Sequence, residues 1–552
     1  MESRTLNLRL LRDGRDIETA FTDTFAPGAD RALQESSWAG VDGARVFVGQ
    51  IYSNPPKWGR FLAEGTGEAP NDLFTSGAGA VIFVPVADRI IAVCLGHVHI
   101  ALNDDAFERQ FGLRVTLNSV PRGQLRTLDL ATPDAVTFQK RVQASKDSDL
   151  RAFGVDTLRD LARVAGGTPK NPEFANFLAG KDALSITSNV SAETLQAKCQ
   201  NVLEVYRLTA YQTDFPWVDN LKQVIEKDLV EELDTKLHEA IQALRDGSHS
   251  EVHMSPPEIV NYTEGNQLHY NGFGSHGRTF QSLSVDDYIS ELERCGFEGE
   301  MADIKQKHRI AAKKDSEDEF SEKWRVYDCF VFETSIGTGS DERHYVLFAG
   351  NWYQVARGFK DQVEAHFDSI TKVSVIGKTD CQNEQALIAE LNSNRTDLLK
   401  LDQEPIVPEG VKYANIESCD FFSDQKQFIH LKDGHSSGPI SHLWSQGVVS
   451  AEAFISDNTF RKKLRAKVRS LGGGFEAHLP KASERLVRED YQVVYGIMRK
   501  PYADGSLGLP FFSKVSLQVA AERLNQFGIP VAMELIEKPA SDNASAEDGD
   551  SE

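Results

Sequence analysis

The spacing of hydrophobic residues changes along the chain, and its first part has the short period of β-strands. Apolar and polar residues alternate there in short runs, as they do in half-buried strands. A helix capped by Asn103 or Asp104 is expected before the last of these runs. We therefore expect residues 1–150 to form a β-rich, mixed α/β domain. The expected strands cover residues 5–11, 44–51, 80–86, 89–95 and 111–120.

Beyond this domain, the apolar residues follow the period of a helix. One helix is expected over residues 147–168, ending at the pair Gly166 and Gly167. A long amphipathic helix is expected over residues 216–247. Its apolar side has two alternative partners: the rest of its own domain, or the same helix of a second copy. Residues 151–372 are interpreted as a helical and mixed middle region that serves as a scaffold or binding region.

Residues 373–537 alternate between helical and strand patterns. Such alternation favours a sheet that helices cover on both faces. The fold class is thus α/β, or α+β overall, and the short acidic tail of residues 538–552 is expected to be disordered. The expected helices cover residues 384–393, a segment from residue 441 onwards and 511–528, and the expected strands cover 413–422, 427–431, 491–498 and 530–536.

Composition limits the classes of function. With 60 basic and 82 acidic side chains the chain carries a net charge of −22, so it lacks the overall basic surface of a protein that coats DNA. A locally positive groove is still compatible with this charge. The six cysteines are widely spaced and show no zinc-ligand pattern. No apolar leader or membrane-spanning segment is expected, so we predict a cytoplasmic protein of roughly two or three domains.

Candidate chemistry concentrates between residues 412 and 450. Two apolar runs bracket a polar loop there, which is the pattern of a hairpin. Asp420 stands near the end of the first strand. His430 and Lys432 share one face of the second strand, because side chains alternate along a strand. A carboxylate, an imidazole and an ammonium group can then meet at one edge of the sheet, and Gln446 follows on a helix.

These residues resemble the active-site pattern of the PD-(D/E)XK nuclease superfamily. The resemblance implies a restriction-endonuclease-like core in residues 373–537, in which Glu390 and Asp420 hold Mg²⁺ or Mn²⁺ for hydrolysis of DNA or RNA. It also implies that Lys432 orients the attacking water or stabilises charge on phosphorus. His430 would serve as a general base or ligand, and Gln446 would steady the lysine or the phosphate.

His430 departs from the superfamily, which has a carboxylate at that position. A hard cation such as Mg²⁺ prefers oxygen ligands, so the exchange removes a charge that the cation would use. Two hypotheses therefore stand side by side: a metal-dependent nuclease, and a sensor that binds nucleic acid or a phage component without cleaving it. A third hypothesis is a structural protein that forms homo-oligomers through residues 216–247.

A basic cluster stands out in this acidic chain. Phosphate groups of a nucleic-acid backbone are one partner for such a cluster. The alternative is a solvated basic helix face that docks on the acidic surface of the chain itself. The cluster consists of Arg461, Lys462, Lys463, Arg465, Lys467 and Arg469.

Several longer stretches resemble a sporadically distributed bacterial family of unknown function that is found in genomic islands. The resemblance extends over nearly the whole chain. It implies an origin in mobile elements and a role in defence against phage, with a phage component or a neighbouring gene product as a partner. The stretches are FGLRVTLN, SPPEIV, YVLFAGNWYQV, IESCDFF, FIHLKDGHSSGPISHLWSQG and LPFFSKVSL.

Overall fold

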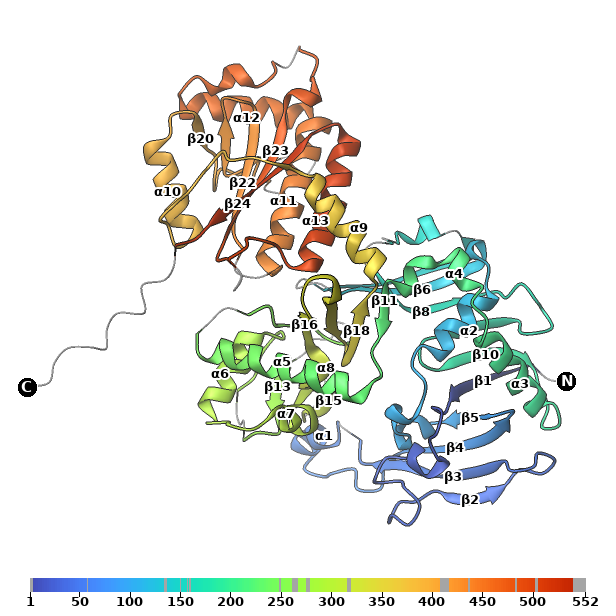
Figure 1. Cartoon of the computed structure of the whole chain (residues 1–552). Coiled ribbons are helices and arrows are strands. Elements are labelled where there is room, and N and C mark those ends of the chain that lie inside the picture. Colours follow the sequence, from blue (N-terminus) through green and yellow to red (C-terminus); the bar gives the residue numbers. More distant parts are fainter. Residues whose placement is uncertain are drawn as a thin grey trace, which may run out of the picture.

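The computed structural model has a mixed α and β fold, in which helices surround four sheets of the described chain (Figure 1). The sheets contain ten, five, three and six strands. The expected α+β class is confirmed. Residues 540–552, most of the expected acidic tail, lie outside the described residues. The structure describes residues 3–56, 58–133, 137–148, 150–155, 157, 160–247, 250–260, 267–274, 278–314, 319–407, 416–434, 437–481, 484–501 and 505–539.

The ten-stranded sheet is antiparallel, with strand order β2-β3-β4-β5-β1-β10-β9-β8-β6-β7. The strands expected at residues 5–11 and 44–51 and the hairpin around Ala87 are confirmed. The sheet continues past residue 150, the expected end of the first domain. Its strands are β1 (Ser3–Leu10), β2 (Gln34–Ser37), β3 (Arg45–Asn54), β4 (Thr75–Val86), β5 (Arg89–Gly96), β6 (Leu125–Thr132), β7 (Phe138–Ser148), β8 (Leu161–Gly167), β9 (Phe177–Gly180) and β10 (Leu184–Asn189).

The helix expected over residues 147–168 is wrong. β7 ends at Ser148, and β8 occupies the last part of the segment. β8 is a strand because it lies between β6 and β9, so its backbone is paired on both sides. Gly166 does not end a helix. It lets β8 pack closely against its neighbours, because a Cβ there would lie 2.7 Å from a methyl group of Thr127 and 2.8 Å from the Cβ of Ala179.

The strand expected over residues 111–120 is also wrong, because helix α2 (Phe111–Ser119) forms there. The large apolar residues of this segment alternate in sequence, as in a strand. In the structure, however, Gly112 and Thr116 between them are buried as well, so the helix is enclosed on most sides. Gly112 allows the close approach: a Cβ at this position would lie 2.1 Å from the carbonyl oxygen of Ala183.

We predict that Gly112→Ala destabilises the protein by about 1–3 kcal/mol, because the added methyl group forces α2 away from the sheet. Chemical denaturation followed by circular dichroism measures the change. Gly123→Ala is the matched control, because no atom lies within 4 Å of a Cβ built at Gly123. Equal stability of the two variants would contradict the proposed close packing.

The middle of the chain holds an antiparallel five-stranded sheet, in the order β11-β18-β17-β16-β12, and a separate three-stranded sheet, β13-β14-β15. Helices α5 to α8 lie beside these sheets (Figure 1). The strands are β11 (Leu221–Gln223), β12 (His253–Met254), β13 (Gln267–Asn271), β14 (Arg309–Lys313), β15 (Ser321–Arg325), β16 (Phe330–Ile336), β17 (Arg343–Phe348) and β18 (Asn351–Val355). The helices that precede or accompany them are α3 (Leu195–Tyr206), α4 (Tyr211–Asp214), α5 (Lys227–Arg245), α6 (Val285–Arg294), α7 (Met301–Lys307) and α8 (Val326–Cys329).

The long helix expected over residues 216–247 is shorter than predicted. Residues Pro216–Asn220 form a 3₁₀ turn and β11 pairs with β18, so α5 begins only at Lys227. Its apolar side is buried in the core of its own chain. Asp234 anchors α5 to α8 and β18, because its carboxylate accepts hydrogen bonds from the Tyr327 hydroxyl (2.7 Å) and the Trp352 indole (2.9 Å).

The last part of the chain forms a six-stranded mixed sheet with the order β19-β24-β23-β22-β21-β20. β20, β21 and β22 are antiparallel neighbours, whereas β22, β23, β24 and β19 run parallel. The helices expected at residues 384–393, from residue 441 and at 511–528 are found, as are the strands expected at 427–431, 491–498 and 530–536. The strand expected over 413–422 is found only from residue 421 onwards, its residues 413–415 lie outside the described residues, and β20 was not expected. The elements are α9 (Arg357–Ser369), β19 (Thr371–Lys372), α10 (Glu384–Asn394), β20 (Leu398–Lys400), β21 (Phe421–Ser423), β22 (Gln427–Asp433), α11 (Ser437–Ser456), α12 (Asn458–Leu471), β23 (Gln492–Arg499), α13 (Phe511–Phe527) and β24 (Val531–Glu537).

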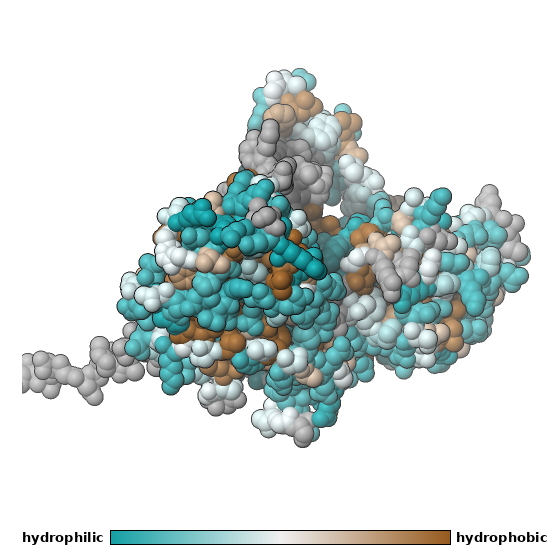
Figure 2. All heavy atoms as spheres, turned by 90° about the horizontal axis from the view of Figure 1, so that it is seen from above, coloured by the Kyte–Doolittle hydropathy of each residue, from teal (hydrophilic) through white to brown (hydrophobic). Residues whose placement is uncertain are grey.

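Helices cover both faces of this mixed sheet. The apolar side of α10 packs with Ile429 and Leu431 on one face. On the other face, α11 and α13 pack against β23 and β24 through residues such as Trp444 and Leu517. Within the described residues, no helix is both long and apolar enough to cross a bilayer. Hydrophilic residues cover most of the face seen in Figure 2, and hydrophobic ones form small patches there.

Candidate functional site

The candidate site lies where β22 extends beyond its neighbour β21. β22 is paired with β23 along its whole length, from Gln427 to Asp433. Its pairing with β21 is much shorter, and it reaches only to Ile429 opposite Phe421. The remaining N–H groups on that side of β22 therefore need other acceptors, because a strand presents strong donors at every second residue.

Two carboxylates accept these hydrogen bonds. The Leu431 N–H donates to Asp420 Oδ2 at 2.6 Å, and the Asp433 N–H donates to Glu384 Oε2 at 3.2 Å. Between them, Lys432 Nζ lies 3.0 Å from Glu384 Oε2. Asp420 and Glu384 thus accept the hydrogen bonds that a neighbouring strand would accept, at the notch where β22 extends past β21, and Lys432 balances the charge of Glu384. We call Glu384, Asp420 and Lys432 the strand-end cluster.

The surroundings of Asp420 disfavour the ionised form of its carboxyl group. Burial raises the pKa of Asp420 to about 7, and the nearby carboxylates of Glu384, Asp402 and Glu417 raise it as well. The hydrogen bond from Leu431 acts in the opposite direction. Burial, aided by the nearby acids, thus favours the protonated form of Asp420, and a nearby cation would favour the ionised form.

The acidic residue that joins Lys432 is Glu384, which the sequence reasoning missed. Glu384 is the first residue of α10, directly after Asn383, whose side chain caps the helix by accepting the Ala386 N–H. The side chain of a residue in the first turn of a helix can extend beyond the helix end to a neighbouring strand. This capping pattern, Asn followed by Glu, was the signal that could have favoured Glu384.

The predicted residue Glu390 lies further along α10 and has other contacts. Its Oε2 accepts hydrogen bonds from the Cys381 thiol at 2.8 Å and from the Thr379 hydroxyl at 3.4 Å. Both partners lie in the segment that precedes α10, so the Glu390 carboxylate holds this segment against the helix. Of the predicted set, Asp420 and Lys432 thus lie at the end of β22, and the acid that pairs with Lys432 is Glu384 and not Glu390.

His430 is placed in the core rather than in the notch. It is 3% exposed, and its Nε2 lies 3.3 Å from the Ser450 hydroxyl on α11. Burial lowers the pKa of His430 to about 4, so its ring is neutral at physiological pH. Lys432 shares its strand but reaches Glu384 on α10 instead, so the two side chains have separate surroundings.

Gln446 lines a neighbouring pocket. This open pocket has a volume of about 470 Å³ and lies between α11 and the segment that joins β20 to β21. Glu417, which also raises the pKa of Asp420, lines the same pocket, whereas Asp420 and Lys432 do not. The other lining residues are Pro405, Ile416, His442, Ser445 and Val449.

Most of the basic cluster on α12 is engaged within its own chain. Among the described residues, five of its six cations contact backbone carbonyls or carboxylates, and Lys462 is exposed. The cluster therefore serves largely to fasten α12 to its surroundings. The contacts run from Arg461 to the carbonyls of Phe454 and Ile455, from Lys463 to the carbonyl of Val407, from Arg465 to the carbonyls of Glu476 and Leu479, from Lys467 to Glu404 and from Arg469 to Glu476.

The donor set of the strand-end cluster is consistent with a hard divalent cation. Within the described part of the chain, no group of three or more His, Cys, Asp or Glu is arranged to hold a metal ion. Asp420 and Glu384 supply carboxylate oxygens alone. Mg²⁺ is commonly bound by one or two carboxylates, with waters and substrate phosphates completing its shell. Asp420 and Glu384 are thus the two residues of the cluster that could serve as ligands for such a cation.

Comparisons with known proteins place the whole chain in one family. A family model described as "Family of unknown function (DUF6119)" matches residues 6–537. The chain belongs to this family. The match includes the strand-end cluster and all four sheets, and the expected membership of a family of unknown function is confirmed. Neither the curated proteins nor the solved structures contain a match to the chain.

We predict that Asp420→Asn stabilises this part of the protein increasingly as the pH rises from about 4 to about 7. The folded pKa of Asp420 is raised, so the folded state holds a proton that the unfolded state has lost, and wild-type stability falls across this window. Asparagine cannot ionise and avoids the loss. Thermal unfolding at several pH values measures the effect, a few degrees at the upper end.

The control for this prediction is Asp397→Asn, because Arg395 hydrogen-bonds the Asp397 carboxylate and lowers its pKa. This variant should lose stability over the same window rather than gain it. A stability difference between Asp420→Asn and wild type that stays constant over the window would contradict the raised pKa.

Proposed function

We propose that the strand-end cluster is the active centre of a metal-dependent nuclease with a core of the PD-(D/E)XK type. The observation that carries the proposal is the ion pair of Lys432 with Glu384 beside the Asp420 carboxylate, at the free end of a central strand. The order of elements supports it: a helix with an acid, three antiparallel strands, a crossover helix and a parallel strand. The proposed reaction is hydrolysis of a phosphodiester in DNA or RNA.

Each residue of the cluster has a distinct proposed role. Glu384 and Asp420 would hold Mg²⁺ or Mn²⁺, which when bound activates water and polarises the phosphate. Asp420 must lose its proton to do so, because a protonated carboxyl is a poor ligand. Lys432 would orient the attacking water or stabilise negative charge that develops on the phosphate oxygens. Gln446, which lines the pocket beside Glu417, would steady the lysine or the phosphate.

His430 favours a second candidate function. The histidine stands where the superfamily has a carboxylate, and it is buried and neutral. Its ring neither supplies charge to a cation nor faces the notch, so metal binding relies on two carboxylates. The alternative proposal is therefore a sensor that keeps the nuclease core and binds nucleic acid or a phage component without cleaving it.

The proposed setting is defence against phage, and it rests on the resemblance to proteins of genomic islands. A neighbouring gene product is a further proposed partner. Self-association through residues 216–247 has less support, because Leu233, Leu237 and Ile241 of α5 are buried within their own chain.

We predict that Lys432→Ala abolishes cleavage, because the ammonium group that faces the phosphate is lost. Purified protein is incubated with plasmid, single-stranded DNA or RNA in the presence of Mn²⁺, and products are followed on gels. A loss of at least about a hundredfold is expected for an electrostatic catalytic group. Lys426→Ala is the matched control, because Lys426 lies at the other end of β22 in a similar ion pair, with Asp490 at 2.8 Å.

Equal trace cleavage by wild type and Lys432→Ala would show that the activity comes from a contaminant. Binding of nucleic acid that persists in EDTA, with no cleavage by any variant, would instead support the sensor.

We also predict that Glu384→Gln loses most of the activity whereas Glu390→Gln retains it. Both glutamates lie on α10, but only Glu384 contacts Lys432, while Glu390 contacts Cys381 and Thr379. Cleavage rates at saturating Mn²⁺ and the concentration of Mn²⁺ needed for half-maximal rate distinguish the two. The reverse order of effects would restore the assignment made from the sequence.

A further inference from the structure

A serine and a histidine lie side by side on the five-stranded sheet. Ser335 on β16 is paired with His344 on β17, and the side chains of paired residues point to the same face of an antiparallel sheet. The Ser335 hydroxyl lies 2.8 Å from Nδ1 of His344. Both residues line a cavity of about 580 Å³, to which α9 and α13 also contribute. A hydroxyl group next to an imidazole in a cavity is the arrangement of a nucleophile and its general base.

Glu342, directly before β17, lies on the other side of the histidine ring and lines the same cavity. Its Oε2 is 3.5 Å from Nε2 of His344 and 2.7 Å from the Lys360 ammonium group. Hydrogen bonds from Lys360 and, to a smaller extent, from Ser335 lower the pKa of Glu342, so its carboxylate is ionised at neutral pH. A carboxylate beside Nε2 favours the tautomer with its proton on Nε2, and Nδ1 can then accept the Ser335 proton. We call Ser335, Glu342 and His344 the β16–β17 triad.

The surroundings of His344 keep its ring neutral, as a general base requires. Burial lowers the pKa of His344 below its ordinary value. The charged groups that face the ring act in both directions. Lys360 and Lys514 lower the pKa further, whereas Glu342 and Glu364 raise it.

Two other histidines lie beside hydroxyl groups, but both are enclosed in the core. His430 is 3% exposed and lies next to Ser450. His308 is fully buried, and its Nδ1 lies 2.6 Å from the Tyr288 hydroxyl. A substrate cannot reach either pair without opening the fold, whereas the β16–β17 triad lines a cavity.

Helices α9 and α13 bring positive charge to this cavity. Lys360 of α9 and Lys514 of α13 line it, and an ion pair with a glutamate fixes the position of each. Phe511, the first residue of α13, also lines it and stacks on the His344 ring, with centroids 6.0 Å apart. The N-terminal end of a helix carries partial positive charge. This end and the two ammonium groups can therefore stabilise negative charge that develops on a carbonyl oxygen.

We propose that the β16–β17 triad hydrolyses a carboxylic ester of a small molecule. Ser335 Oγ attacks the carbonyl carbon while its proton passes to Nδ1 of His344. The bond from the carbonyl carbon to the alcohol oxygen then breaks, and the alcohol leaves with that proton. A water molecule, deprotonated by the same histidine, cleaves the acyl group from Ser335 and restores its hydroxyl. A cavity of about 580 Å³ has the size of a small-molecule site.

This activity goes beyond the proposed nuclease, because no residue of the β16–β17 triad belongs to the strand-end cluster. Its test therefore does not depend on the function of that cluster.

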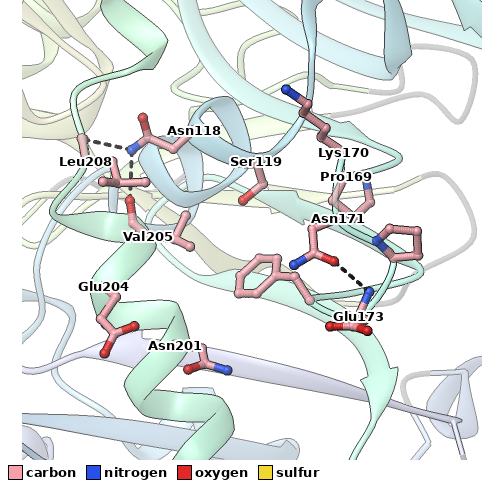
Figure 3. A pocket seen from close by; sticks show the side chains of 12 residues that line it. Asn118, Ser119, Pro169, Lys170, Asn171, Glu173, Asn201, Glu204, Val205 and Leu208 are labelled. Atoms are coloured by element: carbon pink, nitrogen blue, oxygen red, sulfur yellow. Dashed lines mark hydrogen bonds between the residues drawn. The ribbon is translucent and has the colours of Figure 1, made fainter.

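A larger pocket, of about 800 Å³, supplies the control (Figure 3). Ser119 lines it, and its hydroxyl donates a hydrogen bond to the carbonyl of Val115 at 2.8 Å. The described residues that line this pocket include no histidine. Ser119 is thus a serine beside a cavity that lacks a base.

The first experiment labels the full chain with an alkyl fluorophosphonate. An activated serine displaces fluoride from this reagent: its oxygen bonds to phosphorus and its proton passes to the base. Digestion and mass spectrometry should locate the adduct at Ser335 of wild type. His344→Gln should slow labelling by at least about a hundredfold, because it lacks the base. Ser119→Ala should be labelled as fast as wild type.

A second experiment follows hydrolysis of p-nitrophenyl acetate through the release of p-nitrophenolate. Wild type and Ser119→Ala should hydrolyse the ester at the same rate. Ser335→Ala should be at least about a hundredfold slower, because it lacks the nucleophile. Thermal unfolding of each variant should match wild type, which excludes loss of the fold.

Glu342 is a positioning residue, because it acts through His344, and the pH profile of labelling tests its role. Labelling of wild type should fall at acidic pH as His344 takes up a proton, with a midpoint below the ordinary pKa of histidine. Glu342→Gln removes a charge that raises the pKa of His344, so the midpoint should move to lower pH. The rate at neutral pH should fall as well.

Three outcomes would overturn the proposal: an adduct on other serines with none on Ser335, undiminished labelling of His344→Gln, or equal ester hydrolysis by wild type and Ser335→Ala. The position of the adduct is determined on wild type, so this result does not depend on the folding of a variant.

Discussion

The free end of β22 is the constraint on which the candidate site depends. A strand that outlasts its neighbour leaves N–H donors without partners, and in a partly buried position each of them needs an acceptor. Asp420 and Glu384 supply these acceptors at Leu431 and Asp433. The same hydrogen bonds fix the two carboxylates on either side of Lys432. The geometry of the backbone therefore places the acidic groups, and no separate scaffold is required.

This arrangement places carboxylates close together in a partly buried position, which makes ionisation of Asp420 less favourable. Burial is the main cause of the raised pKa of Asp420, and the nearby carboxylates add to it. Lys432 pairs with Glu384, one of these carboxylates. His430, by contrast, has the environment of a core residue, with burial that keeps its ring neutral.

The sequence predicted this part of the fold better than the rest, for physical reasons. In the last part of the chain, most helices and strands are long enough for their periods to be distinguished, and these elements were predicted; the three-residue strand β20 was missed. Segment 111–120 failed because a helix buried on most sides shows no polar face, so its alternating large residues resembled a strand. Glu384 was missed in favour of Glu390 because helix spacing fixes a face but not which end reaches the sheet. That depends on the lengths of β21 and β22, which only tertiary pairing decides.

The net negative charge of the chain limits how it could bind a nucleic acid. Hydrolysis of a nucleic acid by an acidic protein needs cations near the substrate backbone. The basic helix α12 offers few, because among the described residues most of its cations are engaged with carbonyls and carboxylates of the same chain. The proposed nuclease would therefore need positive charge near its substrate beyond what α12 offers, and among the residues of the strand-end cluster only Lys432 supplies it.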